Sequence, residues 1–439
     1  MKIRSTVKPR RNAALDEKTY RGLKLAAAAI TSGVAGVLIA RNFFETDKKI
    51  QHKIHTSYAV GDPPFCRTMS HLLGPPLLDG NTVETLENGR RIFPAMLAAI
   101  ASAQRSITFE NFVLSDGSVW RRFAHALAER ARAGVKVHFL QDAMGCNCLH
   151  GEELAMLQRA GAEVEIYRYM KLTRFNQRTH RKILVIDGRV GFTGGVGISD
   201  DWDGDADLPQ RWRDTHYRLE GPTVAQLQQA FMDNWMETRA VVLHGDDYFP
   251  PLHPVGDTTC QVFKSSASEG GENARLMVLL SIAAARKSVR IGNAYFIPDN
   301  LTIQTLVAAC RRGVEVEIIV PGPLIDEKLA RLVGQSRWGP LLEAGVRIYE
   351  YGPALYHCKY MVVDGCWASV GSANLDNRSL RLNAEANINV HDANFGMEHE
   401  AIFEKDRSAS KEITLSSWRN RPLREKALGM LGSILRTQM

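Results

Sequence analysis

The decapeptide THRKILVIDG, Thr179–Gly188, occurs a second time in altered form as YHCKYMVVDG, Tyr356–Gly365. Both stretches contain His, one spacer, Lys, four spacers, Asp and Gly. In a chain of this composition, chance yields roughly a few hundredths of one such motif. Two copies therefore indicate an internal duplication, and the sequence around each copy decides the fold.

The two halves share one order of predicted elements. In each half, a β-branched run, a stretch with an apolar 3.6-residue period and a second β-branched run predict strand, helix and strand. These segments are 107–117, 119–134 and 135–145 in the first half, and 289–300, 301–313 and 314–324 in the second. Alternating strands and helices imply a parallel or mixed sheet with helices on both faces. The sequence therefore predicts an α/β fold of two tandem domains, with mixed sheets flanked by helices and an active site at the interface of the two halves.

The join between the halves is expected near 244–257, a stretch rich in Pro, Asp and Gly. The expected organisation is a basic N-terminal segment, a first domain, a second domain and a basic amphipathic tail. Their expected bounds are 1–55, 56–248, 249–400 and 401–439.

The repeated motif suits phosphodiester chemistry. Residues i and i+2 of a strand point to the same face, so His180 projects with Lys182, and His357 with Lys359. The lysines can neutralise non-bridging oxygens, one neutral imidazole can attack phosphorus, and the other can donate a proton to the leaving alcohol. Asp187 and Asp364 occupy Asp-Gly hairpin turns, where Asp is favoured in any case. We count both as motif residues that orient the motif rather than touch phosphate.

Net charge and cysteine content limit the binding partners and the redox compartment that we expect for this chain. A net charge of +7 means that some surface faces an anion: nucleic acid, an anionic bilayer or a phosphorylated substrate. The seven cysteines are scattered, which favours a reducing compartment over a disulfide framework. Only GCNCLH, Gly145–His150, hints at metal, and it lacks the usual zinc spacing. No metal and no cofactor are expected.

Both ends of the chain carry candidate membrane segments. Residues 25–40 are uncharged and mostly apolar, which predicts either a single membrane anchor or an Ala-rich helix packed on the protein. Near the C-terminus, apolar residues at 423, 427, 428, 431, 434 and 435 form a helical stripe beside basic residues. This pattern suits the surface of an anionic bilayer or, equally, a terminal helix packed on its own domain.

The motif residues resemble those of the phospholipase D superfamily, whose signature is His-x-Lys-x4-Asp-x6-Gly-Ser/Gly-x-Asn, present twice per active site. The second copy matches fully, with His357, Lys359, Asp364, Gly371, Ser372 and Asn374. The first copy provides His180, Lys182, Asp187, Gly194 and Gly195, but Gly197 stands where Asn is expected. The catalytic candidates are thus the six His, Lys and Asp residues, with Gly195, Ser372 and Asn374 as phosphate-binding or orienting residues.

The resemblance also implies roles for two carboxylates and the two histidines. Glu385 lies where the superfamily carries a carboxylate that holds the catalytic His, which we take to be His357. Asp214 is expected to do the same for the first half. By analogy with two-domain phospholipases D, His180 is the nucleophile and His357 the general acid and base.

Within that superfamily the sequence most resembles bacterial cardiolipin synthases, in FTGGVGISDDW, AYFIPDN, LLEAGVRIYEY and SANLDNRSLRLNAEANI. The resemblance implies a phosphatidyltransferase that joins two phosphatidylglycerols through a phosphatidyl-histidine intermediate and releases glycerol. It implies a location at the bacterial cell membrane, peripheral or single-span, with cytoplasmic catalytic domains and no nucleic-acid partner. A phospholipase D hydrolase or a nuclease would share the catalytic residues, whereas a non-enzymatic scaffold would not need two intact His-Lys pairs.

Overall fold

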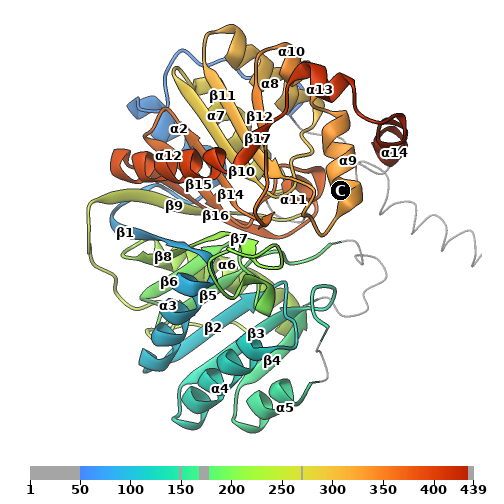
Figure 1. Cartoon of the computed structure of the whole chain (residues 1–439). Coiled ribbons are helices and arrows are strands. Elements are labelled where there is room, and N and C mark those ends of the chain that lie inside the picture. Colours follow the sequence, from blue (N-terminus) through green and yellow to red (C-terminus); the bar gives the residue numbers. More distant parts are fainter. Residues whose placement is uncertain (1–49, 148–150, 168–176, 268–269, 434–439) are drawn as a thin grey trace, which may run out of the picture. The chain divides into compact units, whose positions relative to one another are not determined.

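The computed structural model describes residues 50–147, 151–167, 177–267 and 270–433, all within one compact unit, Asp47–Met439 (Figure 1). The apolar stretch 25–40 and positions 434 and 435 of the C-terminal stripe lie outside these ranges. Within them, no helix combines the length and the apolar character that crossing a bilayer would require.

The first half contributes seven strands to a 15-stranded mixed sheet, in the order β1-β8-β6-β5-β2-β3-β4. Their bounds are β1 Leu78–Glu87, β2 Ser106–Asn111, β3 Lys136–Asp142, β4 Glu163–Tyr167, β5 Ile183–Ile186, β6 Val190–Gly194 and β8 Thr215–Glu220. Its helices are α3 Asn88–Ser102, α4 Ser118–Arg132, α5 Glu152–Arg159, the 3-10 helix η1 Asp200–Trp202 and α6 Val224–Arg239. Strands β2, β3 and β4 are parallel, and the others pair antiparallel.

The second half repeats this order as β9-β16-β15-β14-β10-β11-β12 and adds β17 at the edge. Its strands are β9 Thr258–Ser265, β10 Ser288–Asn293, β11 Glu315–Pro321, β12 Arg347–Tyr351, β14 Lys359–Val363, β15 Trp367–Gly371, β16 Glu385–His391 and β17 Ser410–Glu412. Its helices are α7 Asn273–Ala284, α8 Asn300–Arg311, α9 Lys328–Ser336, α10 Gly339–Glu343, α11 Asn377–Arg381, α12 Ala393–Ser408, α13 Leu415–Arg419 and α14 Leu423–Gly432. The expected duplication of a mixed α/β domain is confirmed.

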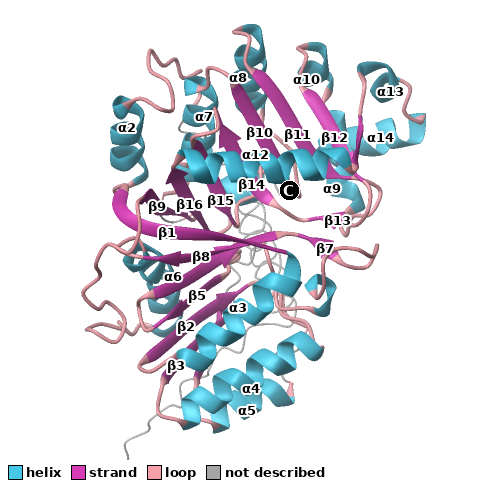
Figure 2. Cartoon of the chain, turned by 60° about the vertical axis from the view of Figure 1, so that its left-hand side comes forward, coloured by secondary structure: helices cyan, strands magenta, loops and turns pink. Residues whose placement is uncertain are grey.

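Helices cover both faces of the sheet because its central strands are apolar on both sides. In β5, Ile183 and Val185 join a core with α6, while Leu184 and Ile186 join a separate core with α3 and α4. A strand buried on both faces reads as a continuous apolar run, as ILVI does here. Figure 2 shows the corresponding arrangement in the second half, where α12 lies across the strands.

Helix α4 shows how an amphipathic stretch finds its place. Trp120, Phe123 and Leu127 recur at helical spacing and are fully buried, whereas the intervening arginines face solvent. The Asp200 carboxylate accepts hydrogen bonds from the backbone N–H groups of Ser118 and Val119, the first residues of this helix. It satisfies donors that a helix N-terminus leaves unpaired, and negative charge is favoured there.

Two expected domain boundaries are wrong. Residue 400 falls inside α12, whose buried Phe395 and Phe403 belong to a core that both halves share. Helix α2 (Pro63–Leu73) lies in the expected first domain but packs on the second half, where the ring centroid of Phe65 is 4.8 Å from that of Trp367. Sequence periodicity gave neither result, because both depend on contacts between distant segments.

Candidate active site

Two short backbone pairings between the halves place the motif histidines. Thr179 forms a parallel bridge with Ala384, and the N–H of His180 donates to the Ala384 carbonyl at 2.8 Å. In the other half, β13 (Leu355–Tyr356) pairs parallel with β7 (Trp212–Arg213), and the N–H of His357 donates to the Arg213 carbonyl at 2.7 Å. Each histidine therefore sits beside the residue that precedes a carboxylate of the opposite half.

The carboxylates consequently pair across the interface. His180 Nδ1 lies 3.0 Å and 3.1 Å from the two carboxylate oxygens of Glu385, and His357 Nδ1 lies 2.6 Å from Asp214 Oδ2. The expectation that Glu385 holds His357, and that Asp214 serves the first half, is wrong. Parallel pairing of segments about 200 residues apart reverses the partners.

Glu385 is held by three side chains of its own half. Ser372 Oγ donates to it at 2.5 Å, Ser379 Oγ at 2.7 Å and Asn383 Nδ2 at 3.4 Å. Ser372 is thus an orienting residue in this structure. Burial acts to raise the pKa of Glu385, but His180, Lys182 and these hydrogen bonds bring it below its usual value. The carboxylate is therefore ionised and accepts the Nδ1 proton of His180.

Asp214 has an equivalent environment made of different residues. The indole Nε1 of Trp202 donates to Asp214 Oδ2 at 3.0 Å, and the N–H of Thr215 donates to Oδ1 at 2.8 Å. A Cβ at Gly195 would lie 2.2 Å from Asp214 Oδ1, so this position, which corresponds to Ser372, has room only for glycine. Burial acts to raise the pKa of Asp214, but His357 and Lys359 bring it below its usual value.

The two lysines are buried beside the histidines. Lys182 Nζ donates to the backbone carbonyl of His180 at 2.9 Å, and Lys359 Nζ donates to that of His357 at 2.5 Å. Burial lowers the pKa of Lys182 to about 7, with Glu385 opposing, and also lowers the pKa of Lys359. Lys359 in turn helps to lower the pKa of His180 and of Lys182. The four motif groups therefore act on one another electrostatically in a single site.

Both imidazoles are neutral at pH 7 in this site. Burial lowers the pKa of His180 to about 4, and Lys182 adds to that effect while Glu385 opposes it. Burial and Lys359 lower the pKa of His357, with Asp214 opposing. Since each carboxylate accepts from Nδ1, each Nε2 carries a lone pair. A phosphodiester anion between the lysines would favour protonation of these groups, because opposite charge favours the charged form.

The motif aspartates lie away from this chemistry. The Asp187 carboxylate accepts hydrogen bonds from the backbone N–H groups of residues 104–106, and Asp364 does the same at residues 286–288. Five residues of extended chain put Asp187 roughly 16 Å from Lys182. Their place among the catalytic candidates is therefore corrected. They fix the hairpin to the neighbouring strand, as the sequence indicated.

The two positions of the signature asparagine also differ. Asn374 is 3% exposed, and its Oδ1 accepts no hydrogen bond from the described residues. Its role toward phosphate stays a prediction. At Gly197 a Cβ would lie 2.6 Å from Val113 Cβ and 3.0 Å from the Trp202 ring. Trp202, which holds Asp214, thus occupies the room that a side chain at 197 would need.

Aromatic rings enclose the two histidines. The centroid of Phe112 is 5.1 Å from that of His180, and the rings of Trp202 and Trp212 are 5.3 Å and 5.2 Å from His357. Tyr295 lies 6.3 Å from His357, edge to face. These rings help to bury both histidines, which are 8% and 4% exposed, and a low-dielectric environment strengthens the electrostatic interactions inside.

Comparisons with known proteins agree with this geometry. The family model described as "Cardiolipin synthase, PLD-like domain" matches residues 96–235 and 278–407. The chain belongs to this cardiolipin synthase family of phospholipase D-like proteins. It is 34% identical to cardiolipin synthase A of Pseudomonas fluorescens over 79% of this chain and 73% of that protein. It is 32% identical to the major cardiolipin synthase ClsA of Bacillus subtilis over 79% and 73%.

A solved structure supports the fold. The crystal structure of phosphatidylserine synthase from Haemophilus influenzae matches with a TM-score of 0.67 and 14% identity, and the match covers 85% of this chain and 99% of that one. At this level of identity the match concerns the arrangement of strands and helices. In this member of the cardiolipin synthase family, the strands of the two halves form one continuous sheet.

Sequence reasoning missed several residues of the family site. Trp202, Ser379 and Asn383 hold the carboxylates, and the aromatic residues Phe112 and Trp212 line the site. Trp202 and Ser379 stand in the stretches FTGGVGISDDW and SANLDNRSLRLNAEANI, which were read only for their family likeness. Trp202 follows the Gly194-Gly195 pair at the same distance along the chain as Ser379 follows the Gly371-Ser372 pair. This equal spacing was the signal that the sequence offered for both residues.

A second buried network lies behind His180. Thr179 Oγ1 donates to Glu110, Asn234 Nδ2 donates to the same carboxylate at 2.5 Å, and the Thr179 N–H donates to Asp142 at 2.8 Å. Burial raises the pKa of Glu110 to about 7 and that of Asp142 to about 6. These groups hold the chain that carries His180 in this family member.

The arrangement of His, Cys, Asp and Glu side chains bears on metal binding. Across the ranges that the structure describes, no group of three or more His, Cys, Asp or Glu side chains is arranged to hold a metal ion. Part of the GCNCLH stretch, Cys148–His150, lies outside those ranges.

Proposed function

We propose that this member of the cardiolipin synthase family transfers a phosphatidyl group from one phosphatidylglycerol to another and releases glycerol. The carrying observation is the pair of buried imidazoles, each held at Nδ1 by a carboxylate of the opposite half and accompanied by a buried lysine. Two imidazoles that each carry a lone pair on Nε2 can act in succession on one phosphorus, and Lys359 Nζ lies 3.2 Å from that atom of His357. The curated relatives, which are named cardiolipin synthases, favour the same reaction.

In the first step, His180 Nε2 attacks phosphorus, an N–P bond forms and the bond from phosphorus to the glycerol oxygen breaks. Glycerol leaves with a proton from His357, which must be protonated when substrate is bound. The short 2.6 Å contact with the ionised Asp214 favours that imidazolium. The lowered pKa of His180 keeps it neutral and hence nucleophilic.

In the second step, the terminal hydroxyl of another phosphatidylglycerol attacks the phosphatidyl-histidine. His357, now neutral, takes the hydroxyl proton; an O–P bond forms, and the N–P bond breaks to restore His180. Lys182 and Lys359 bind the non-bridging oxygens in both steps, where negative charge builds up in the transition state. His180 and His357 thus serve both half-reactions, and His357 donates a proton in the first and accepts one in the second.

The substrate requires a membrane surface, and we infer that the protein works at the bacterial cell membrane with its catalytic unit on the cytoplasmic side. A net charge of +7 supports an anionic bilayer as partner. Nucleic acid is not expected as a partner. The anchor predicted at 25–40 remains a proposal from the sequence.

Incubation with phosphatidylglycerol in mixed micelles tests the proposal. We expect cardiolipin and glycerol in equal amounts by mass spectrometry, and neither product from His180→Ala. Phosphatidic acid as the main product would replace the transferase with a hydrolase, because water would be the acceptor. A parallel plasmid-nicking assay should show no cleavage; nicking that His180→Ala abolishes would favour the nuclease alternative.

A further inference from the structure

A basic surface cavity lies outside the catalytic site, between the end of α9 and helices α13 and α14. Its volume is about 420 Å³. It is lined by four cationic side chains, an indole and a thioether, from Arg337, Arg419, Arg421, Lys426, Trp418 and Met430. The serine residues 336 and 433 complete the lining, which contains no carboxylate. Four positive groups around one cavity predict an anionic ligand.

The cations are held in place by the protein. The Arg421 guanidinium stacks on Trp418, with 4.6 Å from its carbon to the ring centroid, and donates to the Gln335 carbonyl at 2.8 Å. Trp418 Nε1 donates to the same carbonyl at 2.7 Å. Lys426 Nζ donates to the Arg419 carbonyl at 2.6 Å, which uses one of its three donors.

One donor in this wall lacks an acceptor. Arg421 Nε is buried and has no hydrogen-bond partner among the residues that the structure describes. Three nearby acids lie outside the lining. Glu343 accepts from Arg419 at 2.8 Å, Glu350 accepts from Arg331 at 2.6 Å, and Glu425 acts on Arg421 through its charge. The guanidinium of Arg421 as a lining group suits a phosphate oxygen, the acceptor to which arginine is best matched.

Helix α14 presents an exposed apolar face next to this cavity. It packs on α9 through glycines, since a Cβ at Gly429 would lie 2.6 Å from the Leu332 carbonyl oxygen and one at Gly432 would lie 2.7 Å from Val333. Its apolar side chains therefore turn outward. The exposed fractions are 81% for Leu423, 40% for Leu428, 70% for Met430 and 64% for Leu431. The helix thus packs on the protein, as one sequence interpretation held, and leaves Leu423, Leu428 and Leu431 of the apolar stripe exposed.

We propose that this cavity binds the phosphate headgroup of an anionic lipid while the outward face of α14 enters the bilayer. An apolar face beside fixed cations fits the boundary between acyl chains and headgroups. Soluble anions would use the cations but not the exposed leucines, which is why the lipid is the favoured occupant.

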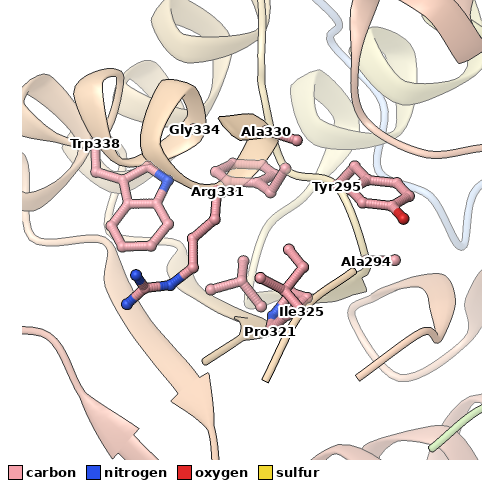
Figure 3. A pocket seen from close by; sticks show the side chains of 10 residues that line it. Ala294, Tyr295, Pro321, Ile325, Ala330, Arg331, Gly334 and Trp338 are labelled. Atoms are coloured by element: carbon pink, nitrogen blue, oxygen red, sulfur yellow. The ribbon is translucent and has the colours of Figure 1, made fainter. Parts of the chain in front are cut away.

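Helix α9 connects this surface with the catalytic site. One side of α9 supports α14, and its Ala330, Arg331 and Gly334 line a narrow, mostly apolar crevice together with Tyr295 (Figure 3). The ring of Tyr295 faces His357. Headgroup binding therefore sets the bilayer beside α9, the helix that shares this crevice with Tyr295. The inference depends on the proposed function only in taking the substrate from a bilayer.

The test compares two cations of the same helix. Lys426 lines the cavity, whereas Arg424 is exposed on α14 and does not. The full chain is placed in nanodiscs of phosphatidylcholine, alone or mixed equally with phosphatidylglycerol, and amide hydrogen exchange is followed in residues 423–432. Phosphatidylglycerol should slow exchange about tenfold, as expected for a site at about ten times its Kd. Lys426→Gln should abolish this slowing, and Arg424→Gln should retain most of it.

Three results would overturn the proposal. Equal loss of slowing in Lys426→Gln and Arg424→Gln would mean that charge on the helix acts without the cavity. Equal slowing in both nanodiscs would mean that the headgroup charge is not recognised. Slowing by soluble glycerol phosphate in phosphatidylcholine nanodiscs would show an anion pocket that is independent of the bilayer. Hydrogen exchange does not report turnover, so failure here leaves the proposed reaction intact. In a separate control, both variants should hydrolyse a soluble nitrophenyl phosphodiester at the rate of the parent.

Discussion

The crossed carboxylates predict which step each of them controls. A nitrophenyl phosphodiester has a leaving group that needs no proton, so release of nitrophenol reports attack by the nucleophile alone. If His180 is that nucleophile, its orientation depends on Glu385, at 3.0 Å and 3.1 Å. Glu385→Gln should therefore slow the nitrophenol burst, and Asp214→Asn should leave the burst but slow the turnover that follows.

The magnitude follows from the lost charge. Gln can still accept from Nδ1, so the change removes a charge-assisted hydrogen bond and leaves a neutral one. Hydrogen bonds to charged groups contribute about 1.5–3 kcal/mol and neutral ones about 0.5–1.5 kcal/mol. The difference of about 1–1.5 kcal/mol corresponds to a rate factor of about 5 to 13. A matched control is Glu317→Gln, because Glu317 is also 1% exposed but pairs with Arg290 and Arg347 away from the site. Its burst should match that of the parent.

Stopped-flow absorbance measures the burst, and mass spectrometry of the quenched protein identifies the histidine that carries phosphorus. The carboxylate whose loss slows the burst should lie in the half opposite to that histidine. If that carboxylate and that histidine lay in the same half, the crossed pairing would be refuted, whichever histidine is the nucleophile. Phosphorus on His357 would reverse the two roles and leave the pairing standing.

Three further results are expected. Asp187→Asn should lower the free energy of unfolding by about 2–4 kcal/mol, measured with urea, because it weakens three bonds to backbone N–H groups, while kcat of the folded protein changes little. Gly197→Asn should cost about 1–3 kcal/mol through overpacking against Val113 and lower the activity; a faster, equally stable variant would contradict this. His180 and His399 have pKa values lowered to about 4 by burial, so each stabilises the fold fully above pH 6.5, and this contribution is lost as the pH falls toward 4. His399→Gln should reduce the loss of stability between pH 7 and pH 5 by about 2 kcal/mol, and an unchanged loss would count against a neutral His399.

The sequence predicted the fold because the duplication is visible in it. Two copies of one motif, each after the same order of apolar periods, require two similar α/β halves, and each His-Lys pair lies at or just before the start of an equivalent strand, β5 or β14. The carboxylate partners were not predictable. They depend on Thr179 lying beside Ala384 and on β7 lying beside β13, and no local period encodes pairing across 205 or 143 residues.

Other residues escaped prediction for similar physical reasons. Trp202 reads as a core aromatic residue, and only its folded position shows that its Nε1 donates to Asp214. The boundary at residue 400 failed because α12 continues without a break, and its apolar face packs on strands rather than ending at a loop. Single-residue roles and boundaries follow from tertiary contacts, whereas the order of elements follows from local pattern.

The exchange of carboxylates has a consequence for ancestry. A half of this chain holds one imidazole together with the carboxylate that the other half's imidazole requires. Its contact surface is self-complementary, as in a two-fold dimer, where each subunit gives its partner what it receives. A single half would therefore be inert alone and would recover two complete histidine–carboxylate pairs on meeting a copy of itself. The two halves differ at the equivalent positions, where Ser372 donates to Glu385 and Gly195 leaves room for Asp214.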